Sequence, residues 1–466
     1  MASFNHGIRY SEISTALQPL ISVDMPTIVF GVAPIFNATN PAPPNTPTLL
    51  YSMTDFKDKF GWSDDFNNHT LCEASYTFFS LYNVRPLICI NVLDPTTHKK
   101  AGTKTVTLSR NRVTFAAKII LSSLVVKSSD TTLTKNDYTA EYDGGNLTLT
   151  VKTPSKVTGN ALQLSYDEID ASKVTKADII AALDLIDEIY SRFQVVPGMV
   201  IAPKFSCDTE VAAVMASKVL DINQCFNCIC LADIPTDTVK EYADCTAYKS
   251  DNNLVDKNLF LCWPKLSLGG KQIYLSTQAA ALMNRVDASE GDNVPYISPS
   301  NHALKCDGAC LADGTEIYLG REKSNYLNSV GIATALNFAG AWRLWGNYSA
   351  IYPVSADSKD TFLPLRRMIH WIGNTLITSF FWRVDSPINR RLIQSIVNSV
   401  NIWLNGLTAR EMILGGRVEF LEEENPTTDL LAGKLTFHCF IGFLVPAQDI
   451  QFLIEFDTSY FNTLFS

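Results

Sequence analysis

The stretch KADIIAALDLIDEIYSRFQVVPGMVIAPKFS, residues 176–206, decides the fold class. Its first part carries apolar residues at helical spacing, namely Ile179, Leu183, Ile186 and Tyr190. This spacing predicts an amphipathic helix, and the apolar run PGMVIAPKFS that follows has the length of a buried strand. A helix that leads directly into a buried strand is typical of an α/β sheet.

The same alternation extends toward the N-terminus. Residues 52–60, SMTDFKDKF, predict a short helix that begins at a capping oxygen of Ser52 or Thr54 and ends at Gly61. The apolar run PLICINVLD, residues 86–94, predicts a buried strand. We therefore assign this part of the chain to the same α/β domain.

From about residue 98 to residue 175 the composition changes to Thr, Val, Lys and Ser in short alternating runs. The string DGGNLTLTVK, residues 143–152, predicts a hairpin, because its two glycines supply the positive φ of a tight turn and its apolar residues alternate with polar ones. We predict an all-β domain at residues 98–175, inserted into a discontinuous α/β domain made of residues 21–97 and 176–325.

The remaining residues, 326–466, are predicted to form a C-terminal domain. Ser386-Pro387 is a helix-start signal, and the helix is expected to reach Leu404 and stop at Gly406. Its expected buried face consists of Ile388, Leu392, Ile396, Val400 and Trp403. Two alternating apolar sets then predict strands: Leu435, Phe437, Cys439 and Ile441, followed by Ile450, Phe452, Ile454 and Phe456. Residues 1–20 lack helical spacing and are expected to form an extended arm.

Composition and charge argue against two classes of partner. The chain has 38 Lys and Arg residues against 47 Asp and Glu residues, a formal charge of −9, and no dense basic stripe, so nucleic acid is not expected. The most apolar long stretch, residues 362–384, contains Arg366, Arg367, His370 and Arg383, so we predict no membrane insertion. The N-terminus lacks the apolar core of a signal peptide, and the chain is expected to stay where it is made.

No motif for catalysis or for cofactor binding is found. Phosphate-binding, dinucleotide, zinc-protease and nucleophile-elbow patterns are missing, and the histidines occur singly, at positions 6, 69, 98, 302, 370 and 438. Cys225, Cys228 and Cys230 lack a fourth ligand, so we interpret them as core residues and not as a zinc site. Residues 422–424, EEE, precede Asn-Pro and are interpreted as a solvated loop. We predict no catalytic residue, no metal and no cofactor.

Several strings, in their order along the chain, resemble the tail sheath proteins of contractile-tailed (myovirus-like) phages and R-type bacteriocins. The strings are SFNHGIRYSEI (3–13), NTPTLLYSMTDFKDKFG (45–61), GMVIAPKFS (198–206), PYISPSNHALKCDG (295–308), LNFAGAWRLWGNYSA (336–350), VNIWLNGLTAREMILGGRVEF (400–420) and NPTTDLLAGKLTFHCFIGFLVPAQDIQFLIEFDTSY (425–460). Residues 98–175 are the main segment without a counterpart. The resemblance implies an α/β (α+β) multidomain fold: a conserved sheath core, the inserted all-β domain, and extended N- and C-terminal arms.

The function implied by this resemblance is structural. The subunit would polymerise as six-fold helical rings around a tail tube, and contraction would drive the tube through a target cell envelope. The implied partners are further copies of the chain, the tail tube protein, and the baseplate and tail terminator proteins. The implied location is the bacterial host cytoplasm during assembly and then the tail of a phage virion or phage-tail-like particle.

A helical sleeve requires two different, complementary surfaces on each copy. Strands at both ends of the chain suit this need by adding to a neighbour's sheet. The candidate residues are Ile8, Tyr10 and Ile13 in the N-terminal arm, and Ile450, Phe452, Ile454 and Phe456 in the last strand. The alternative for the last strand is pairing inside its own domain.

The predicted helix 387–404 resembles the tube-facing attachment helix of the family, so Arg390, Arg391 and Gln394 are expected to face the tube. The alternative is a plain core helix with two solvated arginines. For the whole chain, the competing hypothesis is a cytosolic α/β enzyme with an inserted β domain and an unidentified site. Phage, bacteriocin and other injection systems stay open, as do the host and the extended or contracted state. The insertion is expected to project outward, because a domain facing the tube would block the channel.

Overall fold

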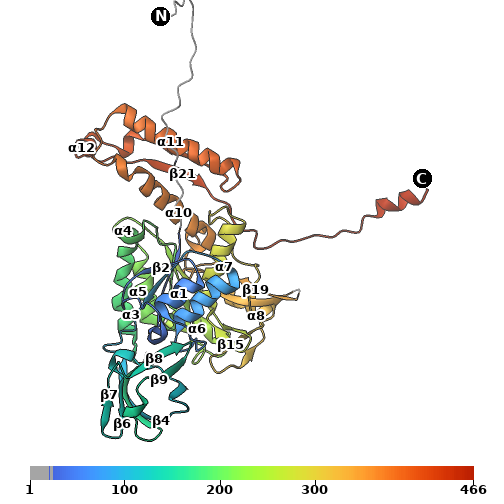
Figure 1. Ribbon diagram of the computed structural model, residues 1–466. Helices are drawn as coiled ribbons and strands as arrows, with labels where there is room; N and C mark the ends of the chain where they lie inside the picture. The colour runs from blue at the N-terminus through green and yellow to red at the C-terminus, as the bar shows by residue number, and fades with distance from the viewer. Residues whose placement is uncertain (1–19, 21–24, 339, 466) are drawn as a thin grey trace, which may run out of the picture.

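An eight-stranded, mostly parallel sheet forms the centre of the chain in the computed structural model, which describes residue 20, residues 25–338 and residues 340–465 (Figure 1). In sheet order the strands are β19 (Ala341–Trp345), β18 (Ile332–Phe338), β13 (Leu259–Cys262), β12 (Ile229–Asp233), β11 (Met199–Ile201), β1 (Thr27–Gly31), β3 (Leu87–Asn91) and β2 (Thr48–Leu50). Only the edge strands β19 and β2 run antiparallel to their neighbours. The α/β prediction is therefore correct for this part.

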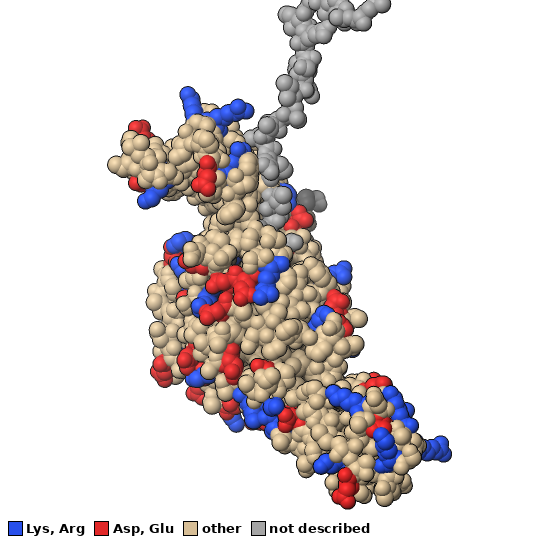
Figure 2. Space-filling model, turned by 60° about the vertical axis from the view of Figure 1, so that its left-hand side comes forward, with Lys and Arg blue, Asp and Glu red and all other residues tan. Residues whose placement is uncertain are grey.

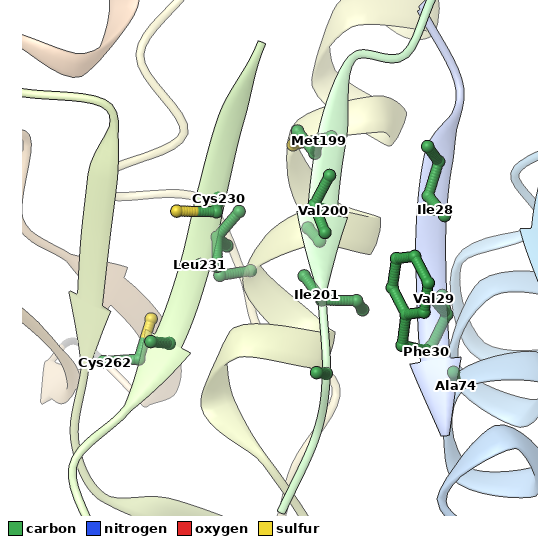
Figure 3. Close-up of a cluster of buried hydrophobic side chains, with 14 of the residues drawn as sticks. Ile28, Val29, Phe30, Ala74, Met199, Val200, Ile201, Cys230, Leu231 and Cys262 are labelled. Carbon is green, nitrogen blue, oxygen red and sulfur yellow. The ribbon is translucent and has the colours of Figure 1, made fainter. Parts of the chain in front are cut away.

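The central strands are apolar because both faces of the sheet are covered. Every residue of β1, β3, β11, β12 and β13 is buried. Figure 3 shows Ile28 of β1 beside Val200 of β11 and Phe30 beside Ile201, with Cys230 and Leu231 on the next strand. Cys228 and Cys230 are buried, as the core interpretation of the cysteines required, whereas Cys225 is partly exposed.

Helices flank the sheet on both sides (Figure 1). They are α1 (Met53–Phe60), α2 (Thr70–Ser75), α3 (Lys176–Ala182), α4 (Ile189–Phe193), α5 (Thr209–Lys218), α6 (Asp244–Asp251), α7 (Leu275–Ser289) and α8 (Arg321–Asn328). Local signals placed α1 correctly: the Ser52 side chain accepts a hydrogen bond from the Asp55 amide, and Gly61 follows the last residue with φ of 74°. A small antiparallel sheet, β14 (Lys265–Leu268), β15 (Lys271–Ile273), β16 (Gly308–Cys310) and β17 (Glu316–Ile317), lies in the same body.

Residues 99–169, which we call the β unit, form two antiparallel sheets at the lower end of the molecule (Figure 1). One sheet holds β4 (Lys99–Thr107), β10 (Ala161–Ile169), β6 (Val125–Ser128) and β7 (Thr131–Leu133), and the other holds β5 (Arg112–Ala116), β9 (Asn146–Val151) and β8 (Tyr138–Asp143). The predicted hairpin is present as β8 and β9, with Gly144 at φ of 59°. The buried side chains of the β unit form a hydrophobic cluster of their own.

Residues 363–442, the C-terminal unit, lie at the opposite end and form a third hydrophobic cluster around Trp371 and Trp403 (Figure 1). The elements of this unit are α10 (Leu363–Phe380), α11 (Arg390–Ala409), β20 (Gly415–Glu419), α12 (Thr427–Leu431) and β21 (His438–Gly442), with the short α9 (Ser358–Thr361) before it. Within the described part of the chain, none of the helices combines the length and apolar character that crossing a bilayer requires.

The expected bounds of the helix in the C-terminal unit, and part of its expected buried face, are wrong. The helix begins at Arg390 and not at Pro387, because the Asn389 side chain caps it by accepting a hydrogen bond from the Leu392 amide at 2.9 Å. It runs through Gly406 because the next residue, Leu407, is buried in the same core. Ile388, expected in the core, lies outside the helix and is exposed.

Residues 450–456 adopt neither strand nor helix in the single chain, so the strand expected there stays a prediction that requires another copy. The chain leaves the C-terminal unit after β21, runs extended, and ends in a short 3₁₀ helix, Thr458–Phe465. An internal partner for this segment, the alternative considered for the last strand, is not present within the described residues.

Candidate assembly surfaces

The C-terminal arm exposes the apolar side chains that the sequence singled out. Exposed fractions are 68% for Ile450, 84% for Phe452, 96% for Ile454 and 75% for Phe456. Figure 1 shows this arm running away from α11 and α12. Upstream, the Tyr348 hydroxyl donates a hydrogen bond to the Gln448 side chain at 2.5 Å, which ties the start of the arm to the body. The arm therefore presents an apolar segment that its own chain leaves uncovered.

The N-terminal candidates Ile8, Tyr10 and Ile13 lie outside the described residues. For the described arm, the burial of four large apolar side chains in a neighbour would contribute on the order of 6–12 kcal/mol before the cost of association is subtracted. This gross term is of the same order as the cost of association, which is about 4–15 kcal/mol.

β20 and β21 form a two-stranded antiparallel sheet against α11. On its α11 face, Val418 and Ile441 belong to the third hydrophobic cluster. On the opposite face, the Arg417 guanidinium lies 4.1 Å from the Phe440 ring centroid. A sheet of only two strands is marginal by itself, so this one depends on α11 for its stability.

The predicted tube-facing residues Arg390, Arg391 and Gln394 lie together in the first turns of α11, and all three are exposed. Figure 2 shows basic side chains protruding from the upper end of the C-terminal unit. Among the described residues, no carboxylate lies within ion-pair distance of either arginine. Both arginines lie in the first turn of α11, at the positive end of the helix dipole. This turn contains no acidic residue that would offset their charge.

An open groove of about 710 Å³ adjoins these residues, between the first half of α11 and the end of β20. Its apolar lining includes Ile388, Ile393, Val397, Phe420 and Leu421. The groove is shallow and combines apolar side chains with Arg390 and Gln394 at its rim, which suits a protein partner better than an enclosed small molecule.

The sequence predicted a solvated loop at residues 422–424, and only part of this segment is solvated. Glu422 and Glu423 are exposed, whereas the Glu424 carboxylate pairs with the Nδ1 atom of His438 at 2.6 Å. This contact joins the loop before α12 to the start of β21. His438 was not identified from the sequence, because a lone histidine gives no sign of a partner fourteen residues away.

An enzyme of this topology would bind its ligand at the carboxyl ends of β1 and β11, where the strand order reverses. Here the protein's own groups fill that edge. The Val32 amide donates to the Thr70 hydroxyl at 3.2 Å, and the Ala33 amide donates to the Asn91 side chain at 3.0 Å. Backbone groups that would cradle a phosphate are therefore already bonded.

Carboxylates also occupy the N-terminus of α7, which lies near the end of β12. The Glu73 carboxylate accepts from the Tyr274 amide at 2.8 Å, and the Asp233 carboxylate accepts from the Ser276 amide at 3.0 Å. Burial raises the pKa of Glu73 to about 8 and the pKa of Asp233 to about 6. These acids cap a helix inside a closed core and leave no room there for an anionic ligand.

Burial also shifts the pKa values of two histidines. Burial lowers the pKa of His370 to about 3, and its Nε2 atom lies 2.9 Å from the Asn258 side chain. Burial lowers the pKa of His69 to about 4 as well, and neither ring nitrogen of His69 has a hydrogen-bond partner among the described residues. Across the described ranges, no group of three or more His, Cys, Asp or Glu side chains is arranged to hold a metal ion.

Several tail sheath proteins are similar to this chain in sequence or in fold. No protein-family profile matches the chain. The chain is 28% identical over 494 residues to the tail sheath protein of Burkholderia phage BcepMu, and the match covers 99% of both proteins. It is 26% identical over 181 residues to the tail sheath protein of Escherichia phage P2, covering 38% of this chain and 43% of that protein. The sheath of an extracellular contractile injection system, PVC, in its contracted state shares the fold, with a TM-score of 0.60, 12% identity and 99% of each chain covered.

Proposed function

We propose how this chain, a structural subunit of a contractile tail sheath by its sequence and structural similarity, assembles and works. It polymerises as six-fold helical rings around a tail tube, and contraction of the rings drives the tube through the envelope of a target cell. The observation that carries this proposal is the end-to-end similarity to a phage tail sheath protein. The enzyme hypothesis is not supported, because the edge of the sheet where a ligand would bind is filled by the protein's own side chains.

Neighbouring copies are joined by exchanged strands. Ile8, Tyr10 and Ile13 of the N-terminal arm and Ile450 to Phe456 of the C-terminal arm add to the small sheet of other copies. Support comes from the uncovered apolar side chains of the C-terminal arm and from the two-stranded sheet that has room for more strands. A strand joined through backbone hydrogen bonds keeps copies connected while their bodies rotate.

The tube binds at the first turns of α11, through Arg390, Arg391 and Gln394. The two arginines lie at the unfavourable end of a helix dipole without an acidic neighbour in the first turn, an arrangement that an acidic tube surface would relieve. Baseplate and tail terminator proteins close the two ends of the sheath. The assembled protein resides in a virion tail or a phage-tail-like particle, after assembly in the host cytoplasm.

The β unit corresponds to the inserted domain predicted at residues 98–175, and it faces outward on the sheath. Its support is its position at the opposite end of the molecule from α11 (Figure 1). A tube-facing α11 therefore directs the β unit away from the channel.

Negative-stain electron microscopy of the purified chain tests the proposal. We expect hollow tubes with a wide lumen and a regular helical repeat, formed either at high concentration or on co-expression with a tube protein. Deletion of residues 449–466 should leave a folded subunit, with an unchanged circular dichroism spectrum, that forms no long sleeves. Uniform small particles in the presence of a tube protein would refute the proposed function, and long sleeves from the deletion variant would refute strand exchange.

A further inference from the structure

A pocket of about 310 Å³ lies where the α/β body meets the C-terminal unit. We propose that this pocket binds a small anion that carries a phosphoryl group, either inorganic phosphate or a phosphate monoester. The volume is at the lower end of the range for small-molecule sites. All of the groups named below belong to one copy of the chain, so the site does not depend on sheath assembly.

The pocket is built from both parts of the molecule. The loop before β3 supplies Arg85, and α7 of the body supplies Arg285 and Asp287. Helix α10 of the C-terminal unit supplies Trp371. Figure 1 shows α7 near α10, and Arg367 of α10 pairs with Asp287 of α7 across this junction. A ligand in the pocket would therefore contact the body and the C-terminal unit at once.

Two arginines give the pocket its positive charge. Arg85 and Arg285 both line it and are exposed, so their guanidinium groups can turn toward a ligand. In the described ranges of the chain, neither has a carboxylate within ion-pair distance. One guanidinium is enough to hold a carboxylate through two parallel hydrogen bonds, whereas two guanidinium groups from separate elements suit a dianion with oxygens on several sides. This arrangement favours a phosphoryl group.

The acidic residue in the lining is already compensated. Asp287 accepts hydrogen bonds from Arg367 through both carboxylate oxygens: Nη1 donates to Oδ1 at 3.1 Å, and Nη2 donates to Oδ2. The two side chains are largely buried, which keeps this pair together. The charge of Asp287 is thus offset by Arg367, and the charges of Arg85 and Arg285 remain for a ligand.

Neutral donors complete the lining. Trp371 is 1% exposed, and its indole N–H has no hydrogen-bond partner within the part of the chain that the structure describes. A buried donor without a partner is unfavourable, and an oxygen of a bound anion would supply the acceptor. The side-chain amides of Asn83 and Asn293 also line the pocket and can donate to a phosphoryl oxygen. The pocket therefore combines two cations with neutral donors, as the binding of an anion requires.

Isothermal titration calorimetry with the full chain tests the site. Inorganic phosphate and glycerol 3-phosphate are each added at constant ionic strength, with sodium chloride and glycerol as the corresponding blanks. We expect one saturable site per chain. Arg85→Gln and Arg285→Gln should each weaken binding roughly tenfold or more, because each removes a charge-assisted hydrogen bond. Arg112→Gln is the matched control, because Arg112 is an exposed arginine of the β unit, and this variant should bind like the unsubstituted chain.

Binding of both ligands would show that the phosphoryl group alone is recognised, and binding of glycerol 3-phosphate alone would show that the ester is needed; either result supports the inference. Absence of binding by both ligands would overturn it. Binding that Arg85→Gln or Arg285→Gln leaves unchanged would overturn it as well. The sheath function would stand in every case.

Fluorine NMR of the full chain labelled with 5-fluorotryptophan locates the ligand. The signal of Trp371 is assigned by its loss in Trp371→Phe. We expect this signal to shift as phosphate or glycerol 3-phosphate binds, because the indole N–H gains an acceptor. A Trp371 signal that stays in place while calorimetry reports binding would put the ligand elsewhere and contradict the inference.

Discussion

Reversal of one charge at the start of α11 should stabilise the helix and damage its function. Arg391 is exposed in a first turn that has no acidic residue. A charge near a helix end contributes about 0.3–1 kcal/mol, so Arg391→Glu removes an unfavourable contribution and adds a favourable one, roughly 0.6–2 kcal/mol in all at low salt. An acidic tube surface that faces this turn would offset the unfavourable contribution of Arg391.

Hydrogen–deuterium exchange measures the gain in helix stability. If α11 amides exchange by local opening, 0.6–2 kcal/mol corresponds to roughly 3–30-fold slower exchange in Arg391→Glu. The gain should shrink as salt is added, because the effect is electrostatic. Arg410→Glu is the control at the other end of the helix, where Arg410 is the C-cap residue and pairs with Asp292 at 2.8 Å. This control should speed exchange.

Sheath assembly on preformed tubes, followed by co-sedimentation, measures the functional cost. Arg391→Glu should reduce the amount of sheath that sediments with tubes, whereas assembly of the subunit without tubes should persist. Two results would refute the reasoning. Faster exchange in α11 would show that Arg391 already stabilises the helix, and unchanged co-sedimentation would show that the arginine does not face the tube.

Three further predictions concern the rest of the chain. Leu149→Ala removes a fully buried side chain from the β unit and should destabilise that unit by about 2–5 kcal/mol, seen as proteolysis confined to residues 99–169. Burial raises the pKa of Glu73 from 4.5 to about 8, so the stability that Glu73 contributes is complete below pH 4.5 and falls as the pH rises toward 8. In Glu73→Gln, the urea concentration at the midpoint of unfolding should therefore change less between pH 5 and 8. Lysine-reactive labels should modify Lys127 of the β unit in assembled sheaths, and protection would count against an outward position.

Short sequence patterns correctly predicted the elements whose ends are set by residues next to them in the chain. The Ser52 cap with Gly61 delimited α1, and the glycines at 144 and 145 marked a hairpin. At α11 the local signal failed. Ser386-Pro387 is a good helix start, but Asn389 provides the cap, and burial of Leu407 carries the helix past Gly406. Burial in a tertiary core outweighs the roughly 1 kcal/mol that a helical glycine costs.

The assembly surfaces were only partly predictable. The alternation in residues 450–456 indicated a strand, yet a strand requires a partner, and the single chain supplies none among its described residues. The Asn401 side chain of α11 bonds to the amide and the carbonyl of Val418 on β20, and the sequence did not indicate this contact. An asparagine inside a helix has no distinctive neighbours in sequence, and these bonds exist only once α11 lies on β20. Pairings created by tertiary contact leave no pattern along the chain.

The contacts of α10 limit where the subunit can move. Arg366, Arg367, His370 and Asn374 are buried on one side of this helix and bond to the body. The Arg366 Nε atom donates to Asn258 at 2.8 Å, Arg367 pairs with Asp287, and Asn374 donates to the Asn227 carbonyl at 2.8 Å. Buried polar bonds of this kind are directional, and breaking one leaves a partner unsatisfied, so the C-terminal unit and the body should move together. We therefore expect any rotation of the subunit during contraction to occur at the chain ends and not between these two parts.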